Sequence, residues 1–153
     1  SGRLGRTTIG VLDALTDGTP EAPGTNFGVL RARQDLGARA SAGLILTDRH
    51  SDAGDNRVVG ADLFVPFRDE YRLQGFIAGS STTGPGGDGG AGWFRVAREG
   101  DIWQYSADYT EVDSDFVAGT GFVQRGNQRR RRGSFAWRPR PRGSAVRQWT
   151  LLY

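Results

Sequence analysis

Apolar and polar side chains alternate residue by residue over long stretches of this sequence. One such run places Trp103, Tyr105, Ala107 and Tyr109 on one side and Gln104, Ser106, Asp108 and Thr110 on the other. A period of two puts successive side chains on opposite faces of an extended chain, so each run predicts a β-strand with two different faces. Helical periodicity is interrupted almost everywhere by Gly, Pro, Asp or Asn. We therefore expect an all-β protein.

The predicted strands are unusually long. Runs of this kind indicate about nine strands, near residues 6–15, 26–34, 39–48, 57–67, 72–80, 91–99, 102–111, 129–138 and 145–153. A strand in a globular protein usually has about five or six residues. A strand that crosses a bilayer at roughly 45° needs about 9–11 residues. The length of the runs therefore favours strands that span a membrane.

The links between these strands alternate in size. Long polar links fall at Asp17–Gly24, Ser51–Asn56, Ser81–Gly90 and Val112–Gln128, and short turns at Asp35–Ala38, Arg68–Tyr71, Glu99–Asp101 and Pro139–Gly143. In an up-and-down antiparallel meander, every second link lies at the same end of the sheet. Long loops on one rim and short turns on the other are typical of outer-membrane barrels.

We thus expect residues 1–153 to form a single unit without an internal boundary, part of an outer-membrane-type β-barrel built as an antiparallel up-and-down meander. A soluble β-sandwich or lipocalin-like barrel is the alternative, because it too shows alternation and turns. The chain has 24 glycines in 153 residues and no initiator Met, and it stops without a polar tail. These features favour a fragment of a larger barrel over a compact domain with its own core.

Several short motifs occur in a familiar order. They are the segments Gly5–Thr16, Thr25–Arg31, Asp35–Gly37, Thr47–Arg49 and Tyr105–Tyr109, then Phe116 and Gly121–Arg125. Together they resemble the C-terminal domain of unknown function that follows a family 9-like carbohydrate-binding module in large bacterial surface proteins. The resemblance implies an outer-membrane β-barrel larger than this segment, with the carbohydrate-binding module upstream. Gln124 departs from the family pattern, which has Pro at that position.

Charge is distributed very unevenly along the chain. All 20 basic residues are Arg; residues 1–120 carry 11 of them with all 17 acids, whereas residues 121–153 carry 9 Arg and no acid. The densest run is Arg129, Arg130, Arg131 and Arg132, followed by Arg138. Arginine beside Phe135 and Trp137 is a pattern of nucleic-acid binding, but alternate side chains of a strand point to opposite faces. We therefore interpret these residues as ligands of anionic lipid, as lumen-lining groups or as partners of nearby acids, and expect no nucleic acid.

Five aromatic residues are candidates for a membrane-interface girdle. They are Trp103, Tyr105, Tyr109, Trp137 and Trp149. Aromatic rings line both interfaces of membrane barrels. The same rings are also compatible with core packing or with a platform on which a sugar stacks.

No catalytic constellation is recognisable. The chain has no Cys and one His, His50, without a nucleophile-elbow motif, and the Gly-rich segment Ser81–Gly90 lacks the Lys of a phosphate-binding loop. Acids near residues 48–55 and 108–115 do not match the spacing of a calcium loop. We expect no enzyme, no metal and no cofactor.

The sequence therefore predicts a segment of a bacterial outer-membrane barrel with a structural or transport-like role. Its partner would be outer-membrane lipid, with carbohydrate bound through an upstream module. The alternative is a soluble all-β carbohydrate-binding or carbohydrate-processing module.

Overall fold

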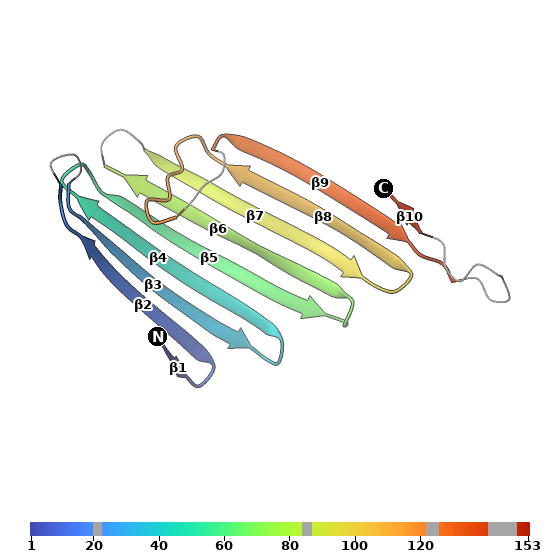
Figure 1. Cartoon of the computed structure of the whole chain (residues 1–153). Helices are drawn as coiled ribbons and strands as arrows, with labels where there is room; N and C mark the ends of the chain where they lie inside the picture. The colour runs from blue at the N-terminus through green and yellow to red at the C-terminus, as the bar shows by residue number, and fades with distance from the viewer. Residues whose placement is uncertain (20–22, 84–86, 122–125, 141–149) are drawn as a thin grey trace.

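The computed structural model describes residues 1–19, 23–83, 87–121, 126–140 and 150–153. Its strands are β1 (Gly2–Leu4), β2 (Thr7–Thr16), β3 (Thr25–Leu36), β4 (Ala40–Ser51), β5 (Asn56–Phe67), β6 (Tyr71–Thr82), β7 (Asp88–Glu99), β8 (Trp103–Val112), β9 (Gln128–Trp137) and β10 (Leu151–Leu152). They form one antiparallel sheet in sequence order, and the described residues include no helix (Figure 1). The predicted all-β meander is confirmed.

The strands differ from the prediction mainly at their ends. The described residues form ten strands instead of about nine, because the short strand β1 precedes the first predicted one. The last predicted strand, 145–153, falls largely on residues 141–149, which lie outside the described residues; within the described part only Leu151–Leu152 is strand. The strands from β2 to β9 have 10 to 12 residues each. The unusual length of the strands is thus confirmed.

The expected contrast between long and short links is smaller than predicted. The turns 37–39, 68–70 and 100–102 are short, but of the links expected to be long, 52–55 and 83–87 are also short, while 17–24 and 113–127 are long. The Gly-rich segment expected as a loop over 81–90 is half strand, because β6 continues to Thr82 and β7 begins at Asp88, which leaves 83–87 as the link. Glycine suits β7 here because a side chain at Gly89 would collide with the backbone of Asp115 and Phe116.

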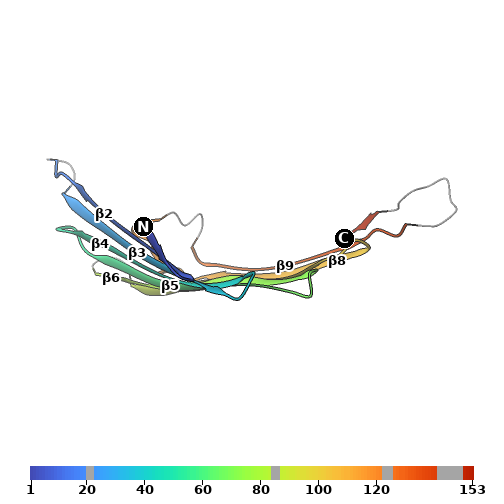
Figure 2. The same cartoon turned by 90° about the horizontal axis from the view of Figure 1, so that it is seen from below.

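The sheet is curved and open. Seen from below, it forms an arc, and the loop between β8 and β9 lies on its inner side (Figure 2). That loop bonds to Asn56 and Ser80, which identifies the face carrying these two residues as the concave one. The two outermost strands, β1 and β10, lie at opposite edges of the sheet and do not pair with each other. The sheet is therefore not closed into a barrel.

The sheet has one layer and little buried core. The pairs of strands in contact are neighbours in the sheet only, and the buried hydrophobic residues of the described part are Val58, Ala97 and Ala136. All three lie on the concave face, as do the buried polar residues Ser41, Thr47, Ser51, Asn56, Ser80 and Ser106. Folding therefore does not bury the large apolar side chains of this chain against one another.

Candidate functional site

The convex face carries a continuous band of exposed apolar side chains. Residues paired in register share a face, and the pairing places Val11, Leu30, Leu46 and Val59 in one row across β2 to β5. Their exposed fractions are 68%, 45%, 45% and 57%. Exposed apolar patches of this extent mark an interaction surface with a protein or a membrane. The band is therefore the principal candidate site of the molecule.

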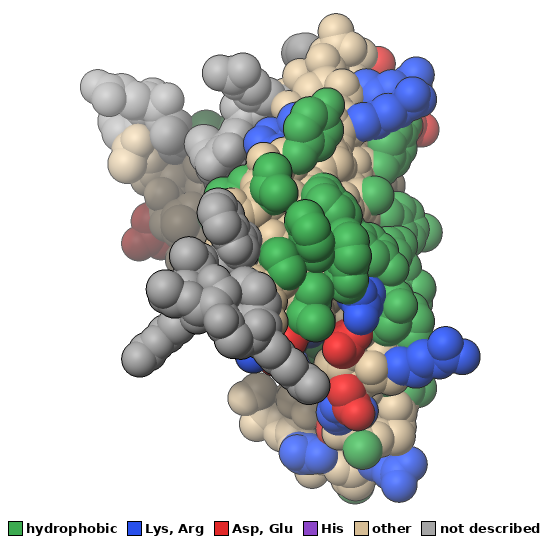
Figure 3. Space-filling model, turned by 90° about the vertical axis from the view of Figure 1, so that its right-hand side faces the viewer, with side chains coloured by type: hydrophobic (Ala, Val, Ile, Leu, Met, Phe, Trp, Pro, Cys, Tyr) green, Lys and Arg blue, Asp and Glu red, His purple; other side chains and the backbone are tan. Residues whose placement is uncertain are grey.

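Charged pairs border this band at the end of the sheet where the longer loops lie. Arg57 Nε donates to Asp48 Oδ1 at 2.7 Å, and Arg129 forms an ion pair with Glu111. Both pairs join residues directly opposite each other on neighbouring strands. Figure 3 shows hydrophobic side chains gathered in a band, with Arg and acidic side chains beyond it at both ends.

Aromatic rings border the band at the opposite end, beside the short turns. Trp103 stacks on Trp137 with ring centroids 5.6 Å apart and lies 5.7 Å from Phe135. Phe67 stacks on Tyr71 at 5.1 Å, and the guanidinium of Arg98 lies over the Tyr71 ring. We call this group the aromatic border: Phe67, Tyr71, Trp103, Tyr105, Phe135 and Trp137.

The structure unites three of the five predicted girdle residues. Trp103, Tyr105 and Trp137 belong to the aromatic border, whereas Tyr109 lies toward the other end, donating to Glu111 Oε2 at 2.5 Å. Trp149 lies outside the described residues. Sequence reasoning missed Phe67, Tyr71 and Phe135, although Phe67 and Tyr71 flank the turn 68–70 at the same end of the sheet. Aromatic residues directly beside the turns 68–70 and 100–102 are the signal that could have identified this border.

The apolar band runs diagonally across the sheet. On β2 it is centred on Val11, which is in register with Val59 of β5. On β9 the midpoint between Arg129 of the charged border and Trp137 of the aromatic border is Gly133, which is in register with Val65 of β5. The band thus shifts by six residues along the strands, about 20 Å, while it crosses seven spacings between strands, about 34 Å. The strands are therefore tilted by roughly 30° from the perpendicular to the band.

One acidic side chain interrupts the band. Asp13 lies on the convex face of β2 between Val11 and Leu15, and its partner in register on β3 is Gly28.

The arginine run is divided between the two faces. Arg129 and Arg131 lie on the convex face, where Arg131 covers the ring of Tyr109 with its guanidinium 5.9 Å from the centroid. Arg130 and Arg132 are the partners in register of Thr110 and Asp108 on the concave face. Arg138 follows the end of β9, and its backbone N–H donates to the carbonyl of Ile102 at 2.7 Å. These residues therefore do not form one continuous phosphate-binding surface.

The concave face is mixed in polarity and rich in ion pairs. Arg31 reaches across β4 to Asp62 on β5 at 2.5 Å, and Gly43 lies between them where any side chain would collide with both. Arg95 pairs with Asp108 at 3.2 Å, and Arg72 pairs with Glu99. Apolar side chains such as Phe76 also lie on this face. The partners come from different strands, so spacing along the sequence does not reveal the pairs.

The loop between β8 and β9 is anchored to the concave face by one buried amide. Asn56 is 1% exposed; its Nδ2 donates to Thr82 Oγ1 at 2.9 Å and to the carbonyl of Val117 at 3.0 Å. Its Oδ1 accepts from the N–H of Gly119 at 2.7 Å, and Ser80 Oγ accepts from the N–H of Val117. Both the nitrogen and the oxygen of the Asn56 amide group therefore bond to protein partners, and residues 117–119 are held against the concave face.

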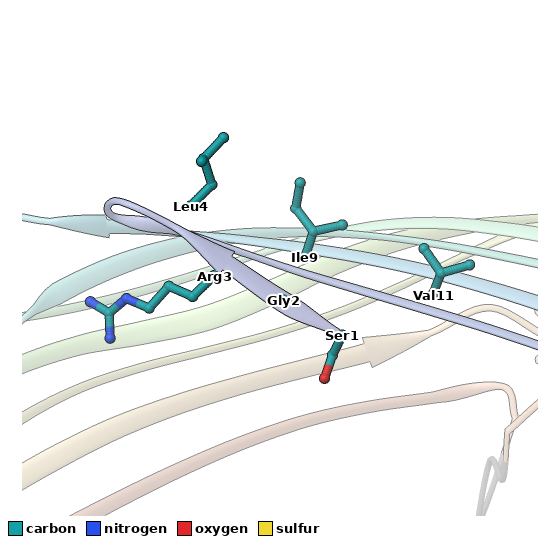
Figure 4. Close-up of a pocket in the computed structure, with 6 residues that line it drawn as sticks. All are labelled: Ser1, Gly2, Arg3, Leu4, Ile9 and Val11. Atoms are coloured by element: carbon teal, nitrogen blue, oxygen red, sulfur yellow. The ribbon is translucent and has the colours of Figure 1, made fainter.

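A hollow lies at the β1 edge of the sheet, where apolar and polar side chains lie on opposite faces. Leu4, Ile9 and Val11 project from one side of the ribbon, while the side chains of Ser1 and Arg3 point to the other side (Figure 4). The hollow is apolar, and it continues the band onto β1.

Among the described residues, the other candidates do not come together in one cluster. His50 is 70% exposed, and its ring nitrogen Nδ1 contacts a carboxylate oxygen of Asp55 at 2.5 Å, not a serine hydroxyl. Asp108 and Glu111 lie on opposite faces of β8, and the described residues contain no group of His, Asp and Glu able to hold a metal ion. Among the same residues, no helix has the length and apolar character needed to cross a membrane.

Comparison with known proteins found no relative of this chain. No protein-family model, no curated protein and no solved structure matches this chain.

Proposed function

We propose that this chain forms part of the wall of a bacterial outer-membrane β-barrel with a structural or transport-like role. The observation that carries the proposal is the diagonal apolar band on the convex face. Strands of membrane barrels tilt by about 35–45°, so an apolar band perpendicular to the barrel axis must cross them diagonally. The band crosses these strands diagonally between Val11 on β2 and Gly133 on β9, which implies a tilt of roughly 30°.

The height of the band supports the same function. From the charged border to the aromatic border, Phe67 lies ten positions along β5 from Arg57, and Trp103 lies eight positions along β8 from Glu111. At the inferred tilt each residue rises about 2.9 Å along the axis, which gives about 23–29 Å. The apolar band of membrane barrels is about 25 Å tall and is bounded by aromatic girdles.

A soluble sandwich would require a second layer over the band. Two packed sheets bury their inner faces against each other, but the contacts between described elements are limited to neighbours within one sheet. Val11, Leu44 and Ile77 are 68%, 61% and 56% exposed. In the proposed wall, contact with lipid would remove these side chains from water, which is favourable for apolar surface. The proposal assigns the chain no catalytic step, no cofactor and no nucleic acid.

Membrane fractionation of the intact protein tests the proposal. We expect it to remain with outer membranes through carbonate washing, to dissolve in detergent and to migrate differently on a denaturing gel before and after boiling. Recovery from the soluble periplasm without detergent would contradict the proposal and favour the soluble module.

The resemblance to the domain that follows a carbohydrate-binding module adds a carbohydrate partner, bound outside residues 1–153. In that case, soluble glucans or xylans should leave the tryptophan fluorescence of this chain unchanged. Saturable quenching of Trp103 or Trp137 by sugar would instead assign the aromatic border to sugar stacking.

A further inference from the structure

We infer that the concave face recognises anionic solutes, meaning carboxylates and phosphates, through Arg95, Arg130 and Arg132. This inference rests on the proposed function, because it assigns the solute class of the lumen that the concave face would line. We call these three residues the arginine cluster.

The register brings the cluster together. Arg132 on β9 is opposite Asp108 on β8, and Asp108 is opposite Arg95 on β7. Arg130 lies two residues from Arg132 on the same strand and therefore on the same face. Three guanidinium groups thus lie on β7 and β9, the two strands on either side of β8.

The only carboxylate between them is already engaged. Asp108 accepts from Arg95 Nη1 at 3.2 Å and from Ser106 Oγ at 3.4 Å, and its side chain is 13% exposed. The other acid on the concave side of β7 to β9, Glu99, pairs with Arg72 at the turn end. One carboxylate for three guanidinium groups leaves an excess of two positive charges, and Arg130 and Arg132 are exposed.

The excess charge extends over the whole concave face. On the described strands this face carries Arg3, Arg31, Arg33, Arg49, Arg72, Arg95, Arg130 and Arg132, against Asp35, Asp62, Glu99 and Asp108. These strands therefore carry an excess of four positive charges, which Asp115 of the loop against Gly89 lowers to three. A concave surface with an excess of one sign of charge concentrates ions of the opposite sign, and guanidinium binds carboxylate and phosphate in a bidentate manner.

Residues 1–153 contain no cysteine, which allows a direct measurement. Ser134 lies two residues from Arg132 on the concave face of β9 and is exposed, so Ser134→Cys places the only thiol of these residues beside the cluster, and the protein without this substitution gives the background reaction. We would compare its reaction rates with an anionic sulfonatoethyl and a cationic trimethylammonium thiosulfonate, in the intact protein purified in detergent, after heat-modifiable migration has established that it is folded. Free cysteine in the same buffer gives the intrinsic ratio of the two rates.

The matched control uses the same strand. Relative to free cysteine, we expect the anionic reagent to be favoured at least tenfold, and Arg130→Gln with Arg132→Gln to remove most of that preference. Arg129→Gln with Arg131→Gln removes the same charge from the convex face and should leave the preference intact.

Three results would overturn the inference: a ratio equal to that of free cysteine, equal loss of preference in the two double variants, or a thiol that reacts with neither reagent. All of them are obtained with folded protein. Failure of the proposed function appears separately, as loss of heat-modifiable migration or of membrane association.

Discussion

At the scale of the residue, two glycines on the convex face of β6 have opposite surroundings. A Cβ atom at Gly75 would meet the carbonyl oxygen of Trp93 and would lie 2.8 Å from Cδ1 of Phe94, whereas a Cβ atom at Gly79 has nothing within 4 Å. Phe94 is the partner of Gly75 in register, so its ring occupies the space that glycine leaves. Glycine is required at one position and is only tolerated at the other.

This contrast gives a prediction for stability. Gly75→Ala should lower the free energy of unfolding by about 1–3 kcal/mol, because overpacking shifts Phe94 and the backbone of β7. Gly79→Ala should be neutral or raise it by up to about 1 kcal/mol, because alanine loses less backbone entropy on folding than glycine does. Urea unfolding in detergent micelles, followed by tryptophan fluorescence, measures both. Equal destabilisation by the two variants would contradict the close packing of the Phe94 ring on Gly75.

At the scale of the element, the loop between β8 and β9 depends on Asn56. Asn56→Ala removes the partners of Val117 and Gly119, while Ser80→Ala removes only one acceptor. Each buried group left without a partner costs about 1–3 kcal/mol. We expect amide hydrogen exchange at residues 117–119 to accelerate about a hundredfold or more in Asn56→Ala and by a smaller factor in Ser80→Ala. Unchanged exchange in Asn56→Ala would show that the loop is held by other contacts.

Strand identity and facing follow from local sequence, but the ends of strands do not. The alternation over 57–67 and 103–110 predicts both the strands and the residues that share a face, because the period of a strand is a local property. The loop predicted over 81–90 is too long, because the reason for Gly89 in β7 is distant in the sequence: Phe116 lies against Gly89. The ion pair between Arg31 and Asp62 could not be predicted from local sequence for the same reason, because β4 lies between the two strands that carry these residues.

At the scale of the whole molecule, the paucity of buried apolar residues and the abundance of glycine have one cause. Large aliphatic side chains such as Leu44 and Ile77 lie on the convex face, and the concave face combines ion pairs and small residues with aromatic side chains such as Phe76 and Trp93. Glycine permits close crossings such as those at Gly43 and Gly89. In the proposed barrel wall, lipid replaces the second layer that would cover the apolar face of a soluble sheet.

Tryptophan quenching by brominated lipid tests most directly whether the convex face contacts lipid. Trp103 lies in the aromatic border on the convex face, whereas Trp93 lies on the concave face of β7. Two variants, in which either Trp103 or Trp93 is the only one of the four tryptophans retained, would be reconstituted in vesicles. The lipids of these vesicles would carry bromine at defined depths on the acyl chain. We predict strong quenching of Trp103, greatest for bromine near the headgroup, and weak quenching of Trp93 at every depth. Equal quenching of the two residues, or quenching of Trp93 alone, would contradict the contact between the convex face and lipid.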